Sequence, residues 1–148
     1  MALNKKDFYA RTMHTPDPPE RAALRAGLRE ISKALIPLHR RLIDVAKDDY
    51  LFAFGPVGSS AQLIDLVRTD PFFAWLQPVT SLIVEIDEMV RTDFEPAAVA
   101  GVAARVEELF VSERYVALLQ RDVEVAMGHA ALRKALTELR HRLSVRVV

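Results

Sequence analysis

Cysteine is absent from this sequence of 148 residues. Its absence excludes disulfide bonds, thiolate zinc sites and a cysteine nucleophile, and it suits a reducing cytoplasm, where we expect the protein to reside. Long uncharged apolar runs are also absent, and the best candidate, residues 72–84, is short and contains Gln77 and Pro78. We therefore expect no transmembrane helix. The first residues include lysines without a following apolar segment, so we expect no signal peptide.

Sequence motifs of the common catalytic and cofactor sites are missing. Residues 55–60 resemble a phosphate-binding loop, but they lack the lysine that reaches the phosphates and follow a predicted helix instead of a strand. No Gly-x-Ser-x-Gly nucleophile motif occurs. The four histidines form no His-x-x-x-His pair, and the single Glu-x-x-His match, residues 138–141, is half of what a di-iron bundle requires. These absences favour a non-catalytic protein without a cofactor.

Net charge is zero, but acidic and basic residues are segregated along the chain. Residues 1–47 carry ten basic and five acidic residues, whereas residues 65–113 carry three basic and ten acidic ones. Basic terminal helices beside an acidic middle pair explain this pattern without any ligand. The alternative is weak nucleic-acid binding through Arg21, Arg25 and Arg29 of the first helix, but no recognition motif accompanies these residues.

The clearest signal is the spacing of apolar residues, which repeats in alternating steps of four and three. One such seam occupies the first predicted helix, and a second occupies the last. This spacing is typical of helix bundles, and no alternation of apolar and polar residues predicts a strand. The first seam comprises Leu24, Leu28, Ile31, Leu35, Leu38, Leu42 and Val45, flanked by Ile36, Ile43 and Tyr50; the second comprises Leu118, Asp122, Val125, His129, Leu132, Leu136, Leu139 and Leu143.

Length and these seams predict a single all-α domain over residues 1–148. We expect an up-and-down bundle of about five helices, with residues 1–18 as a flexible N-terminal arm. Pro37 and Pro78 fall inside periodic segments, and we expect a kink at each of them.

Residues that favour helix caps indicate where the helices begin. Asp17 is a candidate cap for the first helix, and Ser59 or Ser60 for the second. Asp70, which precedes a proline, is expected to cap the third. A break near residues 111–112 should separate the last two helices.

Two polar residues interrupt the second seam. Asp122 and His129 are seven residues apart, so both would lie on one face of a continuous helix. Buried in an apolar bundle they would need partners, and one hypothesis is a metal or small-ligand site in the bundle core, completed by Glu85 or Asp49. The simpler hypothesis is that Asp122 caps a new helix, that Asp49 has a capping or turn role, and that His129 is a hydrogen-bonded core residue.

Aromatic residues gather between positions 50 and 76. Phe52, Phe54, Phe72, Phe73 and Trp75 predict an aromatic cluster that belongs to the core. The alternative is an apolar pocket for a small ligand, with the glycine-containing turn beside it as a gate.

Three segments carry a resemblance to known proteins: residues 54–57 (FGPV), residues 70–76 (DPFFAWL) and residues 82–88 (LIVEIDE). They resemble a bacterial family of small uncharacterised helical proteins, over residues 24–136. The resemblance implies a bacterial cytoplasmic origin, and it implies no activity, cofactor or partner.

Complete seams, balanced charge and the absence of a catalytic set predict a non-catalytic interaction or regulatory module that forms a homo-oligomer. The alternative is a bundle that binds a metal or small ligand near Asp122 and His129, with Glu85 or Asp49. Weak nucleic-acid binding through the basic first helix is the third hypothesis, and we expect no membrane partner.

Overall fold

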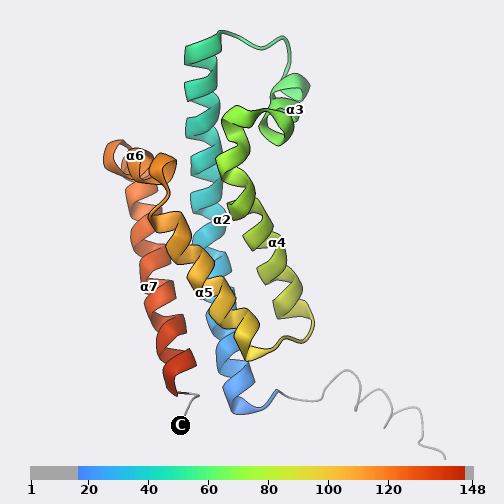
Figure 1. Ribbon diagram of the computed structural model, residues 1–148, viewed down its shortest axis with the longest axis vertical. Coiled ribbons are helices and arrows are strands. Elements are labelled where there is room, and N and C mark those ends of the chain that lie inside the picture. Colours follow the sequence, from blue (N-terminus) through green and yellow to red (C-terminus); the bar gives the residue numbers. More distant parts are fainter. Residues whose placement is uncertain (1–16, 146–148) are drawn as a thin grey trace, which may run out of the picture.

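The computed structural model describes residues 17–145, which form six α-helices and one 3-10 helix, with no β-strand in that range (Figure 1). The predicted all-α class is confirmed, with one helix more than the five expected. Apart from its last two residues, the expected N-terminal arm lies outside the described range. The elements are α2 (Pro19–Phe54), α3 (Ser60–Thr69), η1 (Pro71–Leu76), α4 (Gln77–Arg91), α5 (Pro96–Phe110), α6 (Glu113–Arg121) and α7 (Val123–Val145).

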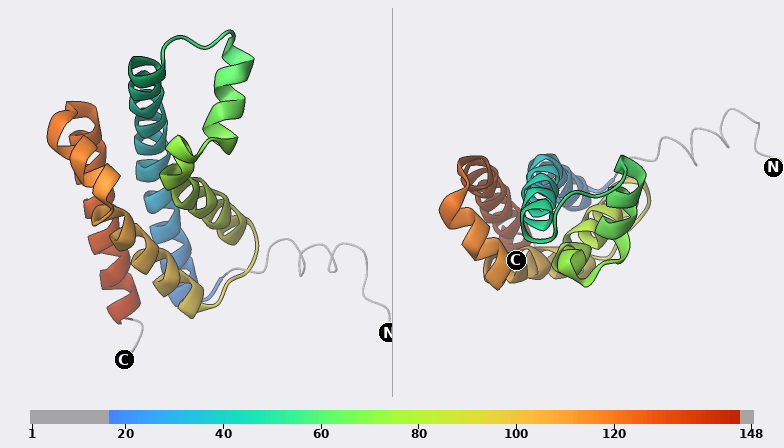
Figure 2. Two further views of the ribbon diagram at one scale, coloured as in Figure 1. Left: turned by 45° about the horizontal axis from the view of Figure 1, so that its top comes forward. Right: turned by 90° about the horizontal axis from the view of Figure 1, so that it is seen from above.

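The four long helices alternate in direction along the chain. In Figure 1, α2 ascends, α4 descends, α5 ascends obliquely and α7 descends. α2 lies between α7 and α4, while α5 packs against all three. Figure 2 shows that the short helices α3 and α6 belong to connections at the same end of the bundle. None of the helices between residues 17 and 145 combines the length and apolarity that a membrane span requires.

The core centres on α2. Nine residues of this helix are buried, including every member of the predicted first seam. The first seam is buried along its whole length because α2 packs against both α7 and α4. Ile36, expected to widen the apolar face, is 42% exposed, so the buried face is narrower than predicted.

α2 and α7 approach closely where each has a glycine. A Cβ atom added to Gly27 of α2 would lie 2.7 Å from Cδ1 of Leu139, and one added to Gly128 of α7 would lie 3.0 Å from Cδ1 of Leu38. Both leucines are buried. Because the two helices run antiparallel, the contacts lie at different heights along one interface. Glycine at these two positions lets the helix axes come nearer than a larger residue would allow.

The two prolines expected to kink helices behave differently from each other. α2 continues through Pro37 without a break, in agreement with its unbroken seam. Pro78 does not lie in a helix interior, because α4 begins at Gln77 and places Pro78 in its first turn. A proline there forfeits no helical hydrogen bond, since the first N–H groups of a helix have no internal partner. The six residues before α4 form η1 instead of the expected α-helix.

The predicted caps are confirmed at two positions and wrong at one. Side chains of Ser59 and Asp70 each accept a backbone N–H from the first turn of the helix that follows. Asp17 does not cap α2, because its carboxylate pairs with Arg25 instead. The expected break near residues 111–112 separates α5 from α6.

Candidate functional site

Asp122 lies between α6 and α7, where it divides the second seam into two helices. Its Oδ1 accepts the backbone N–H of Val125 at 2.9 Å, which makes Asp122 the N-cap of α7. Its two carboxylate oxygens also accept from Nε and Nη2 of Arg41 on α2, at 3.2 and 2.7 Å. Hydrogen bonds from Arg41, and then from Val125, hold the pKa of Asp122 below its usual value. Asp122 thus performs the capping role of the simpler hypothesis and adds a pair between α2 and α7.

His129 lies on α7 beside two aromatic side chains. Its Nδ1 is 2.7 Å from the hydroxyl of Tyr115, and its ring meets that of Phe110 edge-on with centroids 4.6 Å apart. Burial raises the pKa of Tyr115. Burial, and then the charge of Arg133, lower the pKa of His129. Both shifts favour the neutral pair, in which the tyrosine hydroxyl donates to Nδ1 of the histidine.

Asp49 and Glu85 are each paired with an arginine of another helix. Asp49, near the end of α2, accepts from Arg121 of α6, and Glu85 of α4 accepts from Arg105 of α5. The four residues predicted for a site therefore have four different partners. Between residues 17 and 145, no three His, Asp or Glu side chains lie close enough together to hold a metal ion. Each of the four predicted residues therefore contributes to a contact between helices through a partner of its own.

Two of the three arginines considered for nucleic-acid contact stabilise the fold. Arg25 donates to Asp17 and also to the backbone carbonyl oxygens of residues 89, 90 and 92. These carbonyl groups lie at the C-terminal end of α4, where the last carbonyls of a helix have no N–H partner within the helix. Arg25 therefore supplies the hydrogen-bond donors that they would otherwise lack. Arg21 pairs with Asp93 at 2.8 Å, whereas Arg29 is exposed. The first helix consequently offers less free positive charge than its sequence indicates.

Three exposed apolar side chains lie at the end of α2 and on α3, and we call them together the apolar end. They are Phe52, Phe54 and Ile64, which are 95%, 66% and 56% exposed. α2 rises beyond its neighbours at this end of the bundle (Figure 1). No residue of the adjacent helix α3 is buried. The sequence predicts Phe52 and Phe54 in the core, because the residue spacing does not reveal that α2 extends beyond the helices that pack beside it.

The predicted aromatic cluster is present with a different membership. Phe52 projects into solvent, so its predicted place in the core is wrong, whereas Trp75 packs against the core and also lines a pocket. Neighbouring rings of the cluster have centroids 4.9–5.8 Å apart and belong to Tyr50, Phe54, Phe72 and Phe73.

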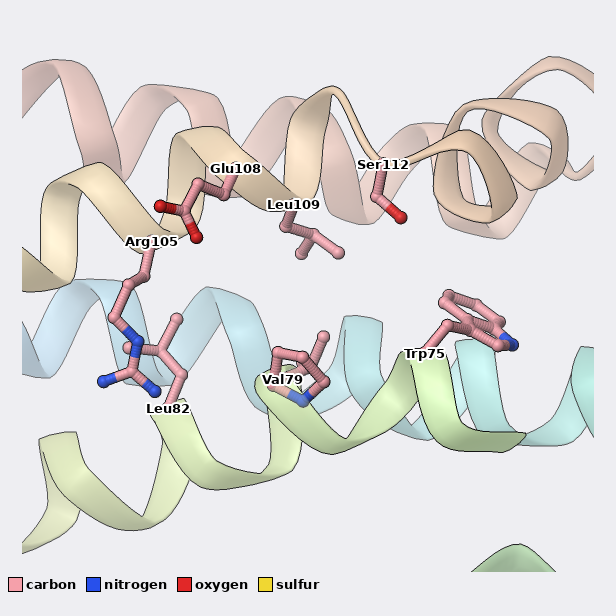
Figure 3. Close-up of a pocket in the computed structure, with 8 residues that line it drawn as sticks. Trp75, Val79, Leu82, Arg105, Glu108, Leu109 and Ser112 are labelled. Carbon is pink, nitrogen blue, oxygen red and sulfur yellow. The ribbon is translucent and has the colours of Figure 1, made fainter. Parts of the chain in front are cut away.

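A pocket of about 230 Å³ opens between α4 and α5, and we call it the α4–α5 pocket. Figure 3 shows its two facing walls, one from η1 and α4 and the other from α5 and the turn before α6. This volume is just below the ~300–1,000 Å³ of pockets that hold drug-sized ligands, so it suits one side chain or a very small molecule. Its lining is apolar except for Arg105, Glu108 and Ser112, and comprises Trp75, Pro78, Val79, Leu82 and Leu109 besides these.

No family model, curated protein or solved structure matches this chain. The resemblance carried by residues 54–57, 70–76 and 82–88 therefore rests on those segments alone. The candidate functions that follow rest on the geometry of the apolar end, the pocket and the paired charges.

Proposed function

We propose that the protein is a non-catalytic interaction module that self-associates through the apolar end. The observation that supports this most directly is the near-complete exposure of Phe52 in the last turn of α2. Aromatic residues are enriched at the centre of protein interfaces, and Phe52 exposes nearly the whole of its side chain. A second copy that covers these side chains would remove their apolar surface from water.

The distribution of charged side chains supports a non-catalytic role. Catalytic sites gather titratable groups with shifted pKa values in one cleft. In this protein the lowered pKa of Asp122 results from a helix cap and an ion pair, and the lowered pKa of His129 from burial beside Tyr115. The two groups belong to separate structural contacts, and neither lines the α4–α5 pocket.

Light scattering or sedimentation of the full-length protein over a wide concentration range tests the proposal. We expect the wild-type mass to rise above that of the monomer with concentration, and Phe52→Ser and Ile64→Ser to shift it back toward the monomer. Met127→Ser is the matched control, because it removes an apolar side chain that is 68% exposed on α7. A wild-type protein that stays monomeric throughout contradicts the proposal, as does an equal effect of Met127→Ser.

A further inference from the structure

α6 is held in the bundle mainly by two buried side chains. The helix has nine residues, and Tyr115 and Leu118 are the buried ones. Ser112 before it and Asp122 after it both have extended backbone conformations, so the helix is continuous with neither of its neighbours. Because isolated helices shorter than ~12–15 residues are marginal in water, the helical form of α6 depends on the packing of these two side chains.

One of the two side chains has His129 of α7 as its hydrogen-bond partner. Tyr115 is fully buried, and within residues 17–145 its hydroxyl has one partner, Nδ1 of His129 at 2.7 Å. In the neutral pair the hydroxyl donates to Nδ1, whereas a protonated histidine carries hydrogen on both ring nitrogens and cannot accept. Protonation of His129 therefore leaves the hydroxyl hydrogen of Tyr115 buried without an acceptor, which is costly where water does not reach.

We propose that α6 is a pH-sensitive lid, and that protonation of His129 opens this helix away from α5 and α7. Opening exposes the hydroxyl of Tyr115 to water, which supplies the missing acceptor, and it also lets water solvate the imidazolium. The buried residues of α2 and α7 can keep their contacts with each other, because the junctions on both sides of α6 are not helical. This inference does not depend on the proposed self-association.

The surroundings of His129 favour its neutral form while α6 is closed. Burial lowers the pKa of His129, and the positive charge of Arg133, one turn further along α7, lowers it further. No carboxylate of the described residues contributes to the shift. The charged residues that α6, α5 and α2 carry beside their contacts with α7 are exposed or already paired; they are Glu113, Arg114, Arg121 (paired with Asp49), Glu107 (paired with Arg140) and Arg41 (paired with Asp122 and Glu124).

The closed and open states bind protons differently. With α6 open, His129 is an ordinary histidine with a pKa of about 6.5, whereas in the closed state its pKa is lower. The open state therefore binds more protons below pH 6.5, and acidification raises the ratio of open to closed protein. This ratio rises about tenfold for each unit by which the closed-state pKa lies below 6.5, and it levels off below that pKa.

Opening of α6 uncovers apolar side chains at one end of the bundle. Tyr115 and Leu118 leave the core, and Phe110 loses the ring of Tyr115 that stacks on it with centroids 6.2 Å apart. The ion pair between Arg121 and Asp49, which joins α6 to α2, breaks at the same time. Because α6 lies at the same end of the bundle as α3 (Figure 2), acidification adds apolar surface to the end where self-association is proposed.

Hydrogen exchange of the full-length wild-type protein tests the inference. Deuterium uptake is followed at pH 7.5 and 5.5 and corrected for the intrinsic pH dependence of amide exchange. We expect residues 113–121 to open up to about tenfold more often at pH 5.5. Residues 60–69 of α3, on the opposite side of α2 from α7 (Figure 1), should open equally often at both pH values. Amides of α6 should also exchange faster than those of residues 24–45 of α2, which require global unfolding.

Two histidine variants separate the lid from a general effect of acid. Asparagine at position 129 offers an amide oxygen as an acceptor and does not titrate, so His129→Asn should abolish the acceleration at α6. His39→Asn is the matched control, because burial also lowers the pKa of His39, but its Nε2 contacts Thr80 of α4. This control variant should keep the full response of α6.

NMR titration of the His129 ring in the wild type keeps the test decisive where a variant fails to fold. It gives the closed-state pKa, and the total rise in α6 opening should equal about tenfold for each unit by which that pKa lies below 6.5. Equal opening of α6 at both pH values, while His129 titrates below pH 6.5, would overturn the inference. Exchange of α6 as slow as that of the α2 core, or an unaltered response in His129→Asn, would overturn it as well.

Discussion

Three glycines lie inside helices. The structure predicts that replacement by alanine stabilises the fold at one of them and destabilises it at the other two. Alanine is preferred to glycine in a helix interior by about 1 kcal/mol. An added Cβ on Gly101 of α5 meets nothing within 4 Å, so this preference acts alone there. Gly101→Ala should therefore raise the free energy of unfolding by roughly 0.5–1 kcal/mol.

The same replacement at the α2–α7 interface should be destabilising. An added Cβ on Gly128 would lie 3.0 Å from Cδ1 and 3.2 Å from Cβ of Leu38, and a Cβ atom cannot rotate away from its backbone. At Gly27 the contact is 2.7 Å from Cδ1 of Leu139, a side-chain end that is fully buried and has little room to move. Overpacking of a core costs ~1–3 kcal/mol, and the preference of a helix for alanine offsets about 1 kcal/mol of this cost. Both variants should therefore have a free energy of unfolding about 1 kcal/mol lower than that of the wild type, with Gly128→Ala the less stable of the two.

Urea unfolding followed by circular dichroism measures all three free energies, with Gly101→Ala as the matched control. Thermal unfolding gives a second measure: for a domain of this size, 1 kcal/mol corresponds to a Tm change of about 3 °C, so a stabilising and a destabilising variant are easily distinguished. If Gly128→Ala were as stable as Gly101→Ala, the close approach of α2 and α7 would be refuted.

Three further predictions concern the paired polar residues. Asp122→Ala should lower the free energy of unfolding by about 1 kcal/mol through the lost cap alone, whereas Asp122→Asn keeps the cap and should cost less. Urea unfolding of wild type and both variants with added zinc or manganese also tests the alternative metal site, which requires a metal-dependent stabilisation that both variants lose. Arg25→Met should cost about 2–3 kcal/mol, because three carbonyl groups at the end of α4 and the carboxylate of Asp17 lose their donor; thermal unfolding measures it. Because the pKa of His129 is lowered in the folded protein, the unfolded chain binds more protons than the folded one between the folded-state pKa and about pH 6.5. Keeping His129 neutral therefore costs the fold nothing above about pH 6.5, and the free energy of unfolding declines as the pH falls below it. A plot of Tm against pH should therefore be flatter for His129→Asn, although not flat, because burial also lowers the pKa of His39.

The helices could be predicted from the sequence because their spacing depends on neighbours along one helix. The first seam is the clearest case, and all of its residues are buried. The sequence does not decide whether the second seam divides at Asp122, because Leu118 before it and Val125 after it are both buried and keep the seam spacing across the break. Periodicity therefore cannot reveal the break, and only the capping preference of Asp122 indicates it.

The partners of the polar residues could not be predicted. Arg41 and Asp122 are 81 residues apart, and Arg121 and Asp49 are 72 apart, so each pairing depends on the packing of helices that are distant in sequence. The exposure of Phe52 has the same origin. Its spacing fits a helix end, but its surroundings depend on how far α3, α4 and α7 extend beside α2.

The length of α2 beyond its neighbours has a consequence for hydrogen exchange. Its last buried residue is Ala46, and the final eight residues, two turns, are held mainly by the half-buried ring of Tyr50 against Phe72 and Phe73. Amides in such turns exchange with solvent through local fraying, at a free energy far below that of global unfolding. A partner that covers Phe52 would slow this exchange. Deuterium uptake over residues 47–54 should therefore report binding in the unlabelled wild-type chain, without any substitution.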